Sequence, residues 1–235
     1  MQLAKLENMA YGLLRNNKIM VFKIKDLCLL MNIKKTKAYN LIKSLKKKNA
    51  IRTIKRGLFS FNDVDNFVLA TSVHFPSYIS FWSALNYYGF TENLPKKIFL
   101  VTTRYSKELN NFKYITLSKK RFFGYYWAGS VILAEKEKAI VDSLLLPKYS
   151  GGVKEIIKCI RNSLNEINIK KLLYYGEKMQ SKSVLRRLGY ILETIGLKNG
   201  LSHINKKIGK GYELFDPNLK RRNNLNKRWL LDVNI

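Results

Sequence analysis

The stretch KKTKAYNLIKSLKKKN, residues 34–49, restricts the fold of this chain more than any other feature. It holds seven lysines, and like charge at this density costs free energy unless the charge is solvated or faces an anion. At 100° per residue the apolar side chains form one stripe, made by Ala38, Leu41, Ile42 and Leu45. The opposite face carries Thr36, Asn40, Lys43 and Lys47, with Tyr39 and Ser44 at its flanks. The stretch therefore predicts an amphipathic helix that packs on other elements and presents a cationic face.

The flanking patterns predict the elements on which this helix packs. Apolar residues recur at helical spacing over residues 3–15 and again over residues 23–31, and a short strand is expected at IMVF, residues 19–22. After the lysine-rich helix, AIRTIKRGLFSF predicts a hairpin that turns at residues 55–57. This order predicts a winged helix-turn-helix DNA-binding domain over residues 1–65.

The balance of charge points to a polyanionic partner. The chain of 235 residues has 44 Lys and Arg against 16 Asp and Glu, a formal net charge of +28. Before Asn62 the only acids are Glu7 and Asp26, against fifteen basic residues. Such an excess favours nucleic acid, an anionic membrane surface or an acidic protein. The winged-helix pattern selects double-stranded DNA among these, as an operator that could carry inverted repeats.

The composition also indicates a compartment. Glu7 interrupts the region where an export signal needs an apolar run, and the uncharged stretch from Phe122 is too short to span a bilayer. The two cysteines, Cys28 and Cys159, make no disulfide framework and suit a reducing environment. We therefore expect a cytoplasmic protein with no membrane partner.

The geometry of a helix-turn-helix assigns roles within the N-terminal domain. The second helix of the pair enters the major groove with its N-terminal residues near the bases. Asn40 could pair with adenine, and Thr36 could contact a base or a thymine methyl group. The expected DNA-binding residues are Thr36, Lys37, Tyr39, Asn40, Lys43, Lys47, Arg52, Lys55 and Arg56. Lys34, Lys35, Lys46 and Lys48 are expected to contact phosphates or to serve solubility. The alternative is that the lysine face is only solvated surface, with the last lysines favourable at a helix C-terminus.

Residues 66–235 predict a larger mixed α/β domain with a helical C-terminal part, which makes the whole chain α+β. A helix is expected around YISFWSALNYYG, residues 78–89, followed by strands within residues 96–103, 112–117 and 122–134. Helices are expected within residues 153–164, 169–179 and 183–196. The final segment, RWLLDVNI, predicts a closing strand with Trp229, Leu231, Val233 and Ile235 on one side.

Strings within this second region resemble the AbiEi antitoxin family of transcriptional regulators. The order Tyr78-Ile79-Ser80, Ser83-Ala84-Leu85, Tyr88-Gly89-Phe90 begins the resemblance. It continues in PKKIFLVTT, FFGY, AEKEKAIVDSLLLP, RRLGYILETIG and RWLLDVNI, so that with the N-terminal domain it covers nearly the whole chain. Each string is largely apolar packing, and their order and spacing carry the resemblance.

The resemblance implies a winged-helix domain joined to an antitoxin domain. Members of the family repress their own operon and counteract a nucleotidyltransferase-like toxin encoded beside them, without needing to bind it directly. Stand-alone members also occur. The alternatives are therefore a winged-helix regulator without a toxin, and a basic RNA-binding or interaction protein.

One polar string in the family-like region permits two interpretations. Glu137, Lys138 and Asp142 could form part of an antitoxin surface. Alternatively, Lys138 and Asp142 pair at i,i+4 while Ile140 and Leu144 pack inward, which we favour. Arg186 and Arg187 could meet phosphate or only solvate a helix.

No pattern of a catalytic site is found. Cys28, His74, Cys159 and His203 are too scattered for a zinc site or a nucleophile–histidine triad, and His74 is expected at a helix end or in the core. There is no phosphate-binding loop of the GxxxxGK[ST] type and no cluster of carboxylates for a catalytic metal. We therefore expect no enzyme activity, no catalytic residue, no cofactor and no metal.

Overall fold

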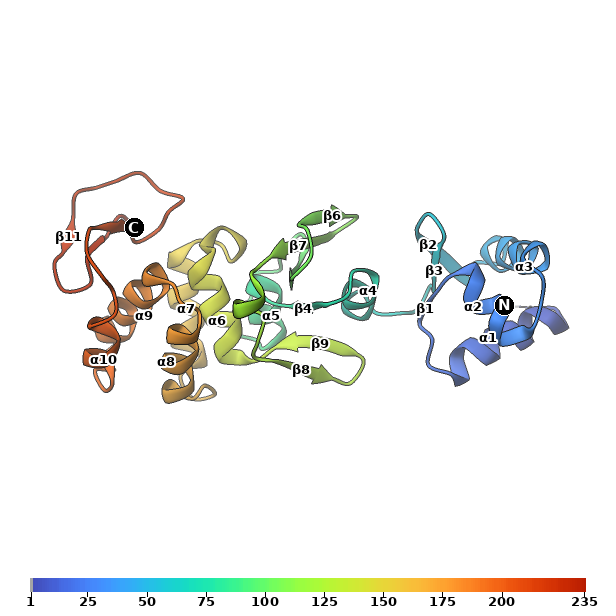
Figure 1. Ribbon diagram of the computed structural model, residues 1–235, viewed down its shortest axis with the longest axis horizontal. Helices are drawn as coiled ribbons and strands as arrows, with labels where there is room; N and C mark the ends of the chain where they lie inside the picture. The colour runs from blue at the N-terminus through green and yellow to red at the C-terminus, as the bar shows by residue number, and fades with distance from the viewer. Residues whose placement is uncertain (1) are drawn as a thin grey trace. The chain divides into compact units, whose positions relative to one another are not determined.

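The computed structural model describes residues 2–235, which form two compact units (Figure 1). The first unit extends to Val73 and the second begins at His74. The sequence placed the division after residue 65. The first unit continues further because α4 packs against strand β1 of that unit. The α+β class expected from the sequence is confirmed.

Up to Phe61 the N-terminal unit has helices and strands in the order that the sequence predicts, and the helix α4 that follows was not predicted. Its elements are α1 (Lys5–Asn16), β1 (Val21–Phe22), α2 (Ile24–Met31), α3 (Lys35–Lys47), β2 (Ile51–Lys55), β3 (Leu58–Phe61) and α4 (Asn66–Val73). The strands form an antiparallel sheet in the order β1-β3-β2, with Phe22 opposite Phe59 and Ile51 opposite Phe61.

The core of this unit is built from the apolar stripes of α1, α2 and α3. Ala10 and Leu14 of α1, Leu27 of α2 and the predicted stripe of α3 are all buried. Phe22 and Phe61 close the core from the sheet side, with their ring centroids 5.7 Å apart. The apolar stripe of α3 is therefore confirmed.

The second unit has a six-stranded sheet followed by helices. The strands are β4 (Ser77–Ile79), β5 (Ile98–Thr102), β6 (Lys107–Leu109), β7 (Phe112–Thr116), β8 (Tyr125–Ala128) and β9 (Val131–Ala134). They lie in the order β6-β7-β5-β4-β9-β8, with β5 parallel to β7 and β4 parallel to β9.

The helices of this unit gather around α6. They are α5 (Phe81–Tyr87), α6 (Lys136–Leu145), α7 (Val153–Ser163), α8 (Ile169–Lys178), α9 (Lys182–Thr194) and α10 (Leu201–Asn205). Short 3-10 turns lie at Lys119–Arg121 and Pro147–Tyr149. Figure 1 shows α6 between the six-stranded sheet and the C-terminal helices, and α6 contacts α5, α7, α8 and α9.

Two expectations for this unit were wrong in detail. Tyr78 lies in β4 rather than in the helix predicted around residues 78–89, because Tyr78 and Ile79 pair with Val101 and Leu100 of β5; the helix begins only at Phe81. The C-terminal segment forms only the short strand β12 (Leu231–Asp232), which pairs with β10 (Glu213–Leu214) and β11 (Leu225–Asn226). Leu230 has a φ of +51°, in the left-handed region. Because extended backbone is not compatible with this conformation, the strand begins only after Leu230.

Candidate nucleic-acid interface

Helix α3 supplies the central surface of the candidate site. It begins without a side-chain cap among the described residues, and its first turn contains no acid. Lys34, Lys35 and Lys37 instead lie at the end where the backbone N–H groups give the helix partial positive charge. This placement is electrostatically unfavourable for the free helix and favourable for an anion bound at that end.

The predicted residues of α3 are all exposed. Thr36, Lys37, Tyr39, Asn40, Lys43 and Lys47 lie on the side opposite the buried stripe. The side chain of Tyr39 is unusually open for an aromatic residue, at 59% exposed. Lys35, Thr36, Tyr39 and Asn40 line one hollow of about 390 Å³. The structure therefore brings the two proposed base-reading residues, Thr36 and Asn40, to the same place.

A second hollow joins α3 to the β2–β3 hairpin. It measures about 260 Å³, and Tyr39, Lys43 and Lys46 of α3 line it together with Thr53 and Gly57 of the hairpin. Tyr39 thus belongs to both hollows. The sequence interpretation missed Thr53, although its polar side chain between the buried residues Ile51 and Ile54 could have indicated an outward position.

The basic residues of the hairpin do not share one role. Lys55 and Arg56 are exposed at the turn, which Gly57 closes with a φ of +76°. Arg52 is half-buried, and its guanidinium donates a 3.0 Å hydrogen bond to the carbonyl oxygen of Val64. Arg52 was expected among the DNA-binding residues, at phosphates or in the minor groove; in the structure its guanidinium holds the segment that leads into α4.

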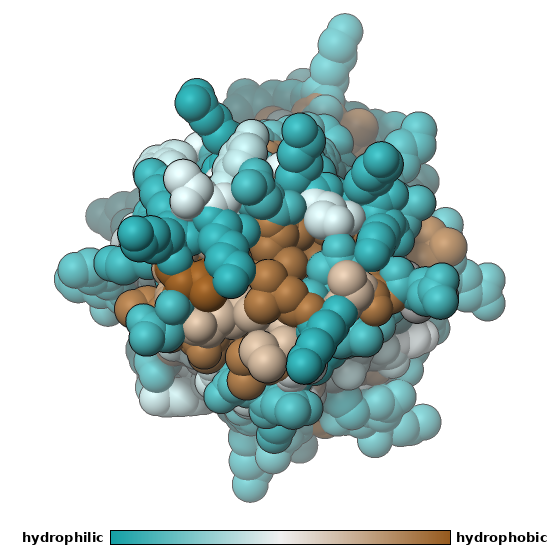
Figure 2. All heavy atoms as spheres, turned by 90° about the vertical axis from the view of Figure 1, so that its right-hand side faces the viewer, coloured by the Kyte–Doolittle hydropathy of each residue, from teal (hydrophilic) through white to brown (hydrophobic). Residues whose placement is uncertain are grey.

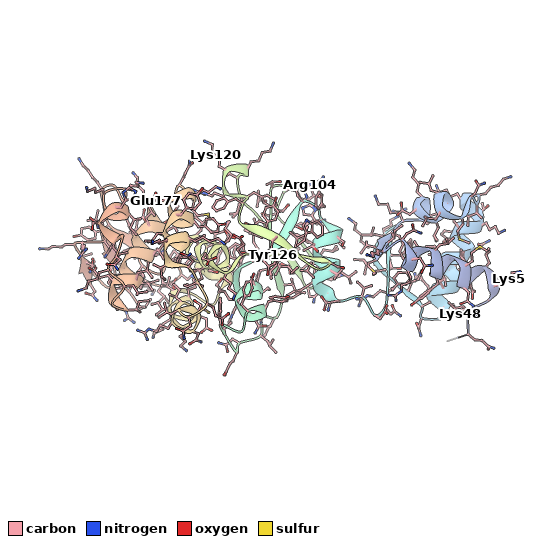
Figure 3. The ribbon with its side chains drawn as sticks, turned by 90° about the horizontal axis from the view of Figure 1, so that it is seen from below. Lys5, Lys48, Arg104, Lys120, Tyr126 and Glu177 are labelled. Atoms are coloured by element: carbon pink, nitrogen blue, oxygen red, sulfur yellow. The ribbon has the colours of Figure 1, made fainter. Side chains whose placement is uncertain are left out.

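A buried carboxylate anchors the other end of α3. Glu7 of α1 accepts hydrogen bonds from Lys48 Nζ and Ser44 Oγ, both at 2.6 Å, and from the backbone N–H of Ala4 at 2.7 Å. The hydrogen bond from Lys48 contributes most to lowering the pKa of Glu7 from 4.5 to about 2. Lys48 (labelled in Figure 3) is therefore part of the fold. The cations that remain exposed on α3 and its N-cap are Lys34, Lys35, Lys37, Lys43, Lys46 and Lys47, and those on the hairpin are Lys55 and Arg56.

The exposed face of the N-terminal unit also has apolar side chains. Figure 2, in which this unit faces the viewer, shows hydrophilic side chains surrounding a hydrophobic centre. The large apolar side chains exposed in residues 2–73 are Met9, Leu29 and Tyr39.

The three residues considered for an antitoxin surface are buried in the second unit. Lys138 and Asp142 have side chains that are 0% exposed, and they form an i,i+4 ion pair within α6. Asp142 also accepts hydrogen bonds from Ser80 Oγ at 2.8 Å and from Tyr78 Oη at 3.1 Å. Burial lowers the pKa of Lys138 and raises that of Asp142, while the pairing opposes both shifts. Together with Glu137, which accepts a 2.8 Å hydrogen bond from the backbone N–H of Asn168, these residues hold elements together rather than form a surface.

The two arginines of α9 are also internal. The guanidinium of Arg186 donates to the carbonyl oxygens of Ile208 and Lys210, and that of Arg187 donates to those of Leu144, Leu214 and Phe215. Contact with phosphate and exposure to solvent both require these side chains to lie at the surface. Both are buried instead, because each binds the backbone of neighbouring segments. His74 is buried against the rings of Tyr105 and Tyr114, in agreement with the expected core position.

Within residues 2–235, no group of three or more His, Cys, Asp or Glu side chains is placed to hold a metal ion. Across the same residues, none of the helices has the length and apolar character needed to cross a membrane.

Comparison with known proteins gives a likeness of fold. No family model matches the sequence, and no curated protein matches it either. Among solved structures, the crystal structure of the RV2827C protein from Mycobacterium tuberculosis is similar, with a TM-score of 0.72 at 12% sequence identity. The match covers 98% of this chain and 92% of that one. At this identity the likeness establishes a common fold over almost the whole of both chains, and nothing about activity.

Proposed function

We propose that this chain is a DNA-binding transcriptional regulator whose N-terminal unit is a winged helix-turn-helix, with α3 as the recognition helix and the β2–β3 hairpin as the wing. The observation that carries the proposal is the start of α3. Three lysines lie at the positive end of an uncapped helix, next to the exposed side chains of Thr36 and Asn40. A DNA phosphate would supply the missing negative charge there, and it would place the two polar side chains beside base edges.

The hairpin supports the same proposal. The hollow between α3 and the hairpin is lined by lysines and by Tyr39, and Lys55 and Arg56 extend from the turn. In this arrangement α3 occupies the major groove, while the turn contacts the phosphate backbone beside it.

The proposed division of labour can be tested by substitution. Asn40→Ala and Thr36→Ala should reduce discrimination between operator and random duplex, by roughly 1–3 kcal/mol for a bidentate base contact. Lys43→Ala, Lys47→Ala and Arg56→Ala should weaken binding to all duplexes and make its salt dependence shallower. Both quantities come from fluorescence-anisotropy titrations at several salt concentrations, using the region upstream of the gene as operator.

Lys5→Ala provides a matched control in the same unit. Lys5 is the first residue of α1 and lies beside Ala4. Glu7 accepts hydrogen bonds from the N–H of Ala4 and from Lys48 at the C-terminal end of α3. Figure 3 labels Lys5 and Lys48. Removal of the Lys5 side chain changes the net charge by the same amount and should leave discrimination and salt dependence nearly unaltered. Equal weakening on both DNAs by Asn40→Ala would refute the assignment of the base-reading face.

We further propose that the protein acts in the cytoplasm as an antitoxin of the AbiEi type, repressing its own operon and counteracting a nucleotidyltransferase-like toxin. The support is the order and spacing of the family-like strings in residues 78–235. The buried Lys138–Asp142 pair removes one candidate surface for direct toxin contact, which favours a neutralisation that does not need it. Co-expression with a nucleotidyltransferase-like neighbour, with growth scored, tests this part. Failure to restore growth would leave a stand-alone regulator.

A further inference from the structure

The segment between β10 and β12, which includes the short strand β11, concentrates positive charge on the second unit. Residues 217–228, here called the cationic loop, carry Lys220, Arg221 and Arg222 before β11 and Lys227 and Arg228 directly after it. No acid occurs between Asp216 and Asp232 in the sequence. The loop residues are exposed except for Asn226, and Figure 1 shows the chain here as an open arc beside α9 and α10.

A buried aspartate fixes the part of the loop that carries the arginines. Asp232 of β12 accepts hydrogen bonds from three successive backbone N–H groups, those of Arg222 at 3.2 Å and of Asn223 and Asn224 at 3.1 Å. Asp232 is only 2% exposed, and these backbone hydrogen bonds stabilise its buried carboxylate. Arg221 Nε lies 3.8 Å from the same carboxylate.

A buried asparagine fixes the start of the loop. Asn234 Nδ2 donates to the carbonyl oxygens of Asp216, Leu219 and Lys220 at 2.9–3.2 Å, and its Oδ1 accepts from the N–H of Asp216 at 2.8 Å. Asn234 is fully buried. Two buried polar side chains thus give a fixed backbone to a loop whose own side chains contribute little to the core.

The cations of the loop differ in how far the fold already uses them. Lys220 and Lys227 are exposed and form no ion pair with the described residues. Arg228 binds Glu193 at 2.5 Å, and Arg222 Nη1 donates to the Ile235 carbonyl oxygen at 3.0 Å. Lys220 and Lys227 are therefore the cations with most freedom to bind an external anion.

We propose that the cationic loop is a second DNA-binding site, which takes the phosphodiester backbone of a duplex without reading its sequence. The site rests on the proposed function, and it adds a contact outside the winged helix. Exposed like charges repel one another, and the fold nevertheless holds them on a fixed backbone, which lowers the entropic cost of binding a polyanion. Lysine and arginine match phosphate oxygens, and the loop offers no exposed aromatic side chain for stacking on single-stranded bases.

The test uses the full chain with Lys220→Ala and Lys227→Ala combined. Anisotropy titrations with operator and with random duplex, from low salt to 0.3 M, give Kd and its dependence on salt. Loss of two phosphate contacts should raise Kd by roughly tenfold near 0.1 M salt and lower the slope of log Kd against log salt by about 1–2. The ratio of the two Kd values should not change, because the loop reads no bases.

Lys96→Ala with Lys154→Ala is the matched control. It removes the same charge from two exposed lysines elsewhere in the second unit, and neither forms an ion pair among the described residues. The inference is overturned if the loop variant binds as the unaltered chain does, or if the control weakens binding equally. It is also overturned if only single-stranded RNA binding changes. If the unaltered chain binds no duplex at all, the proposed function itself fails. If the unaltered chain binds duplex but the loop variant binds equally well, only the cationic loop proposal fails.

Discussion

At the scale of single residues, acids in this cationic chain are placed where they bind several donors at once. Glu7 accepts from a lysine, a serine and a backbone N–H, and Asp232 accepts from three backbone N–H groups. Glu135 and Glu137 both bind Lys171, at 3.2 and 3.5 Å. These four carboxylates therefore join elements that are separate in the sequence.

Glu7 makes the stability of the N-terminal unit depend on pH. Its pKa falls from 4.5 to about 2 on folding, so its contribution is complete above about pH 4.5 and is lost as the pH falls toward 2. Glu7→Gln should reduce the free energy of unfolding at pH 7 and make its decline between pH 4.5 and 2 shallower. Urea unfolding curves across this range measure both effects.

Lys48→Ala is the companion variant, since the Lys48 hydrogen bond is the largest cause of the lowered pKa. It should reproduce part of the loss at pH 7 and should add little to Glu7→Gln when the two are combined. An unchanged acid limb in Glu7→Gln would show that this carboxylate does not control the pH dependence.

At the scale of elements, helix α9 packs closely against Trp229 at Gly189. A Cβ built on Gly189 would lie 2.0 Å from Cζ3 of Trp229, which is fully buried and donates from Nε1 to Glu193 Oε2 at 2.6 Å. The position therefore requires glycine for lack of space, although glycine is a poor helix former.

Opposite effects are expected when alanine replaces glycine in two helices. Gly189→Ala should destabilise the second unit by roughly 1–3 kcal/mol or more, because Trp229 must move. Gly12→Ala in α1, where a Cβ would meet nothing within 4 Å, should stabilise the first unit by up to about 1 kcal/mol. Thermal unfolding of both variants checks this, and equal effects at the two sites would contradict it.

The same elements show where sequence reasoning succeeds and where it stops. The stripe of α3 and most strands could be predicted because local periodicity specifies which side chains face inward. The roles of Arg186, Arg187, Asp232 and Asn234 could not, because each binds backbone groups remote in sequence. All four side chains are buried, and only the tertiary fold supplies their hydrogen-bond partners.

At the scale of the whole molecule, the two units have separate cores. The first is closed by Leu14, Leu27 and Phe61, and the second is built around Ile140, Leu144 and Trp229. The residues proposed to read bases lie in the first unit, and the cationic loop lies in the second. Specific recognition and non-specific affinity should therefore be separable.

We expect a fragment of residues 1–73 to keep discrimination between operator and random duplex with a weaker Kd. A fragment of residues 74–235 should fold and bind duplexes weakly without discrimination, and under the antitoxin proposal it should still relieve growth arrest by a cognate toxin.

In the full chain, combined substitution of Thr36, Asn40 and Lys43 by alanine should abolish repression and leave neutralisation intact. Circular dichroism establishes that each fragment folds, and promoter activity and growth are then scored separately. If the second fragment folds but gives no protection while the full chain does, neutralisation requires the first unit as well, and the proposed separation of the two functions fails.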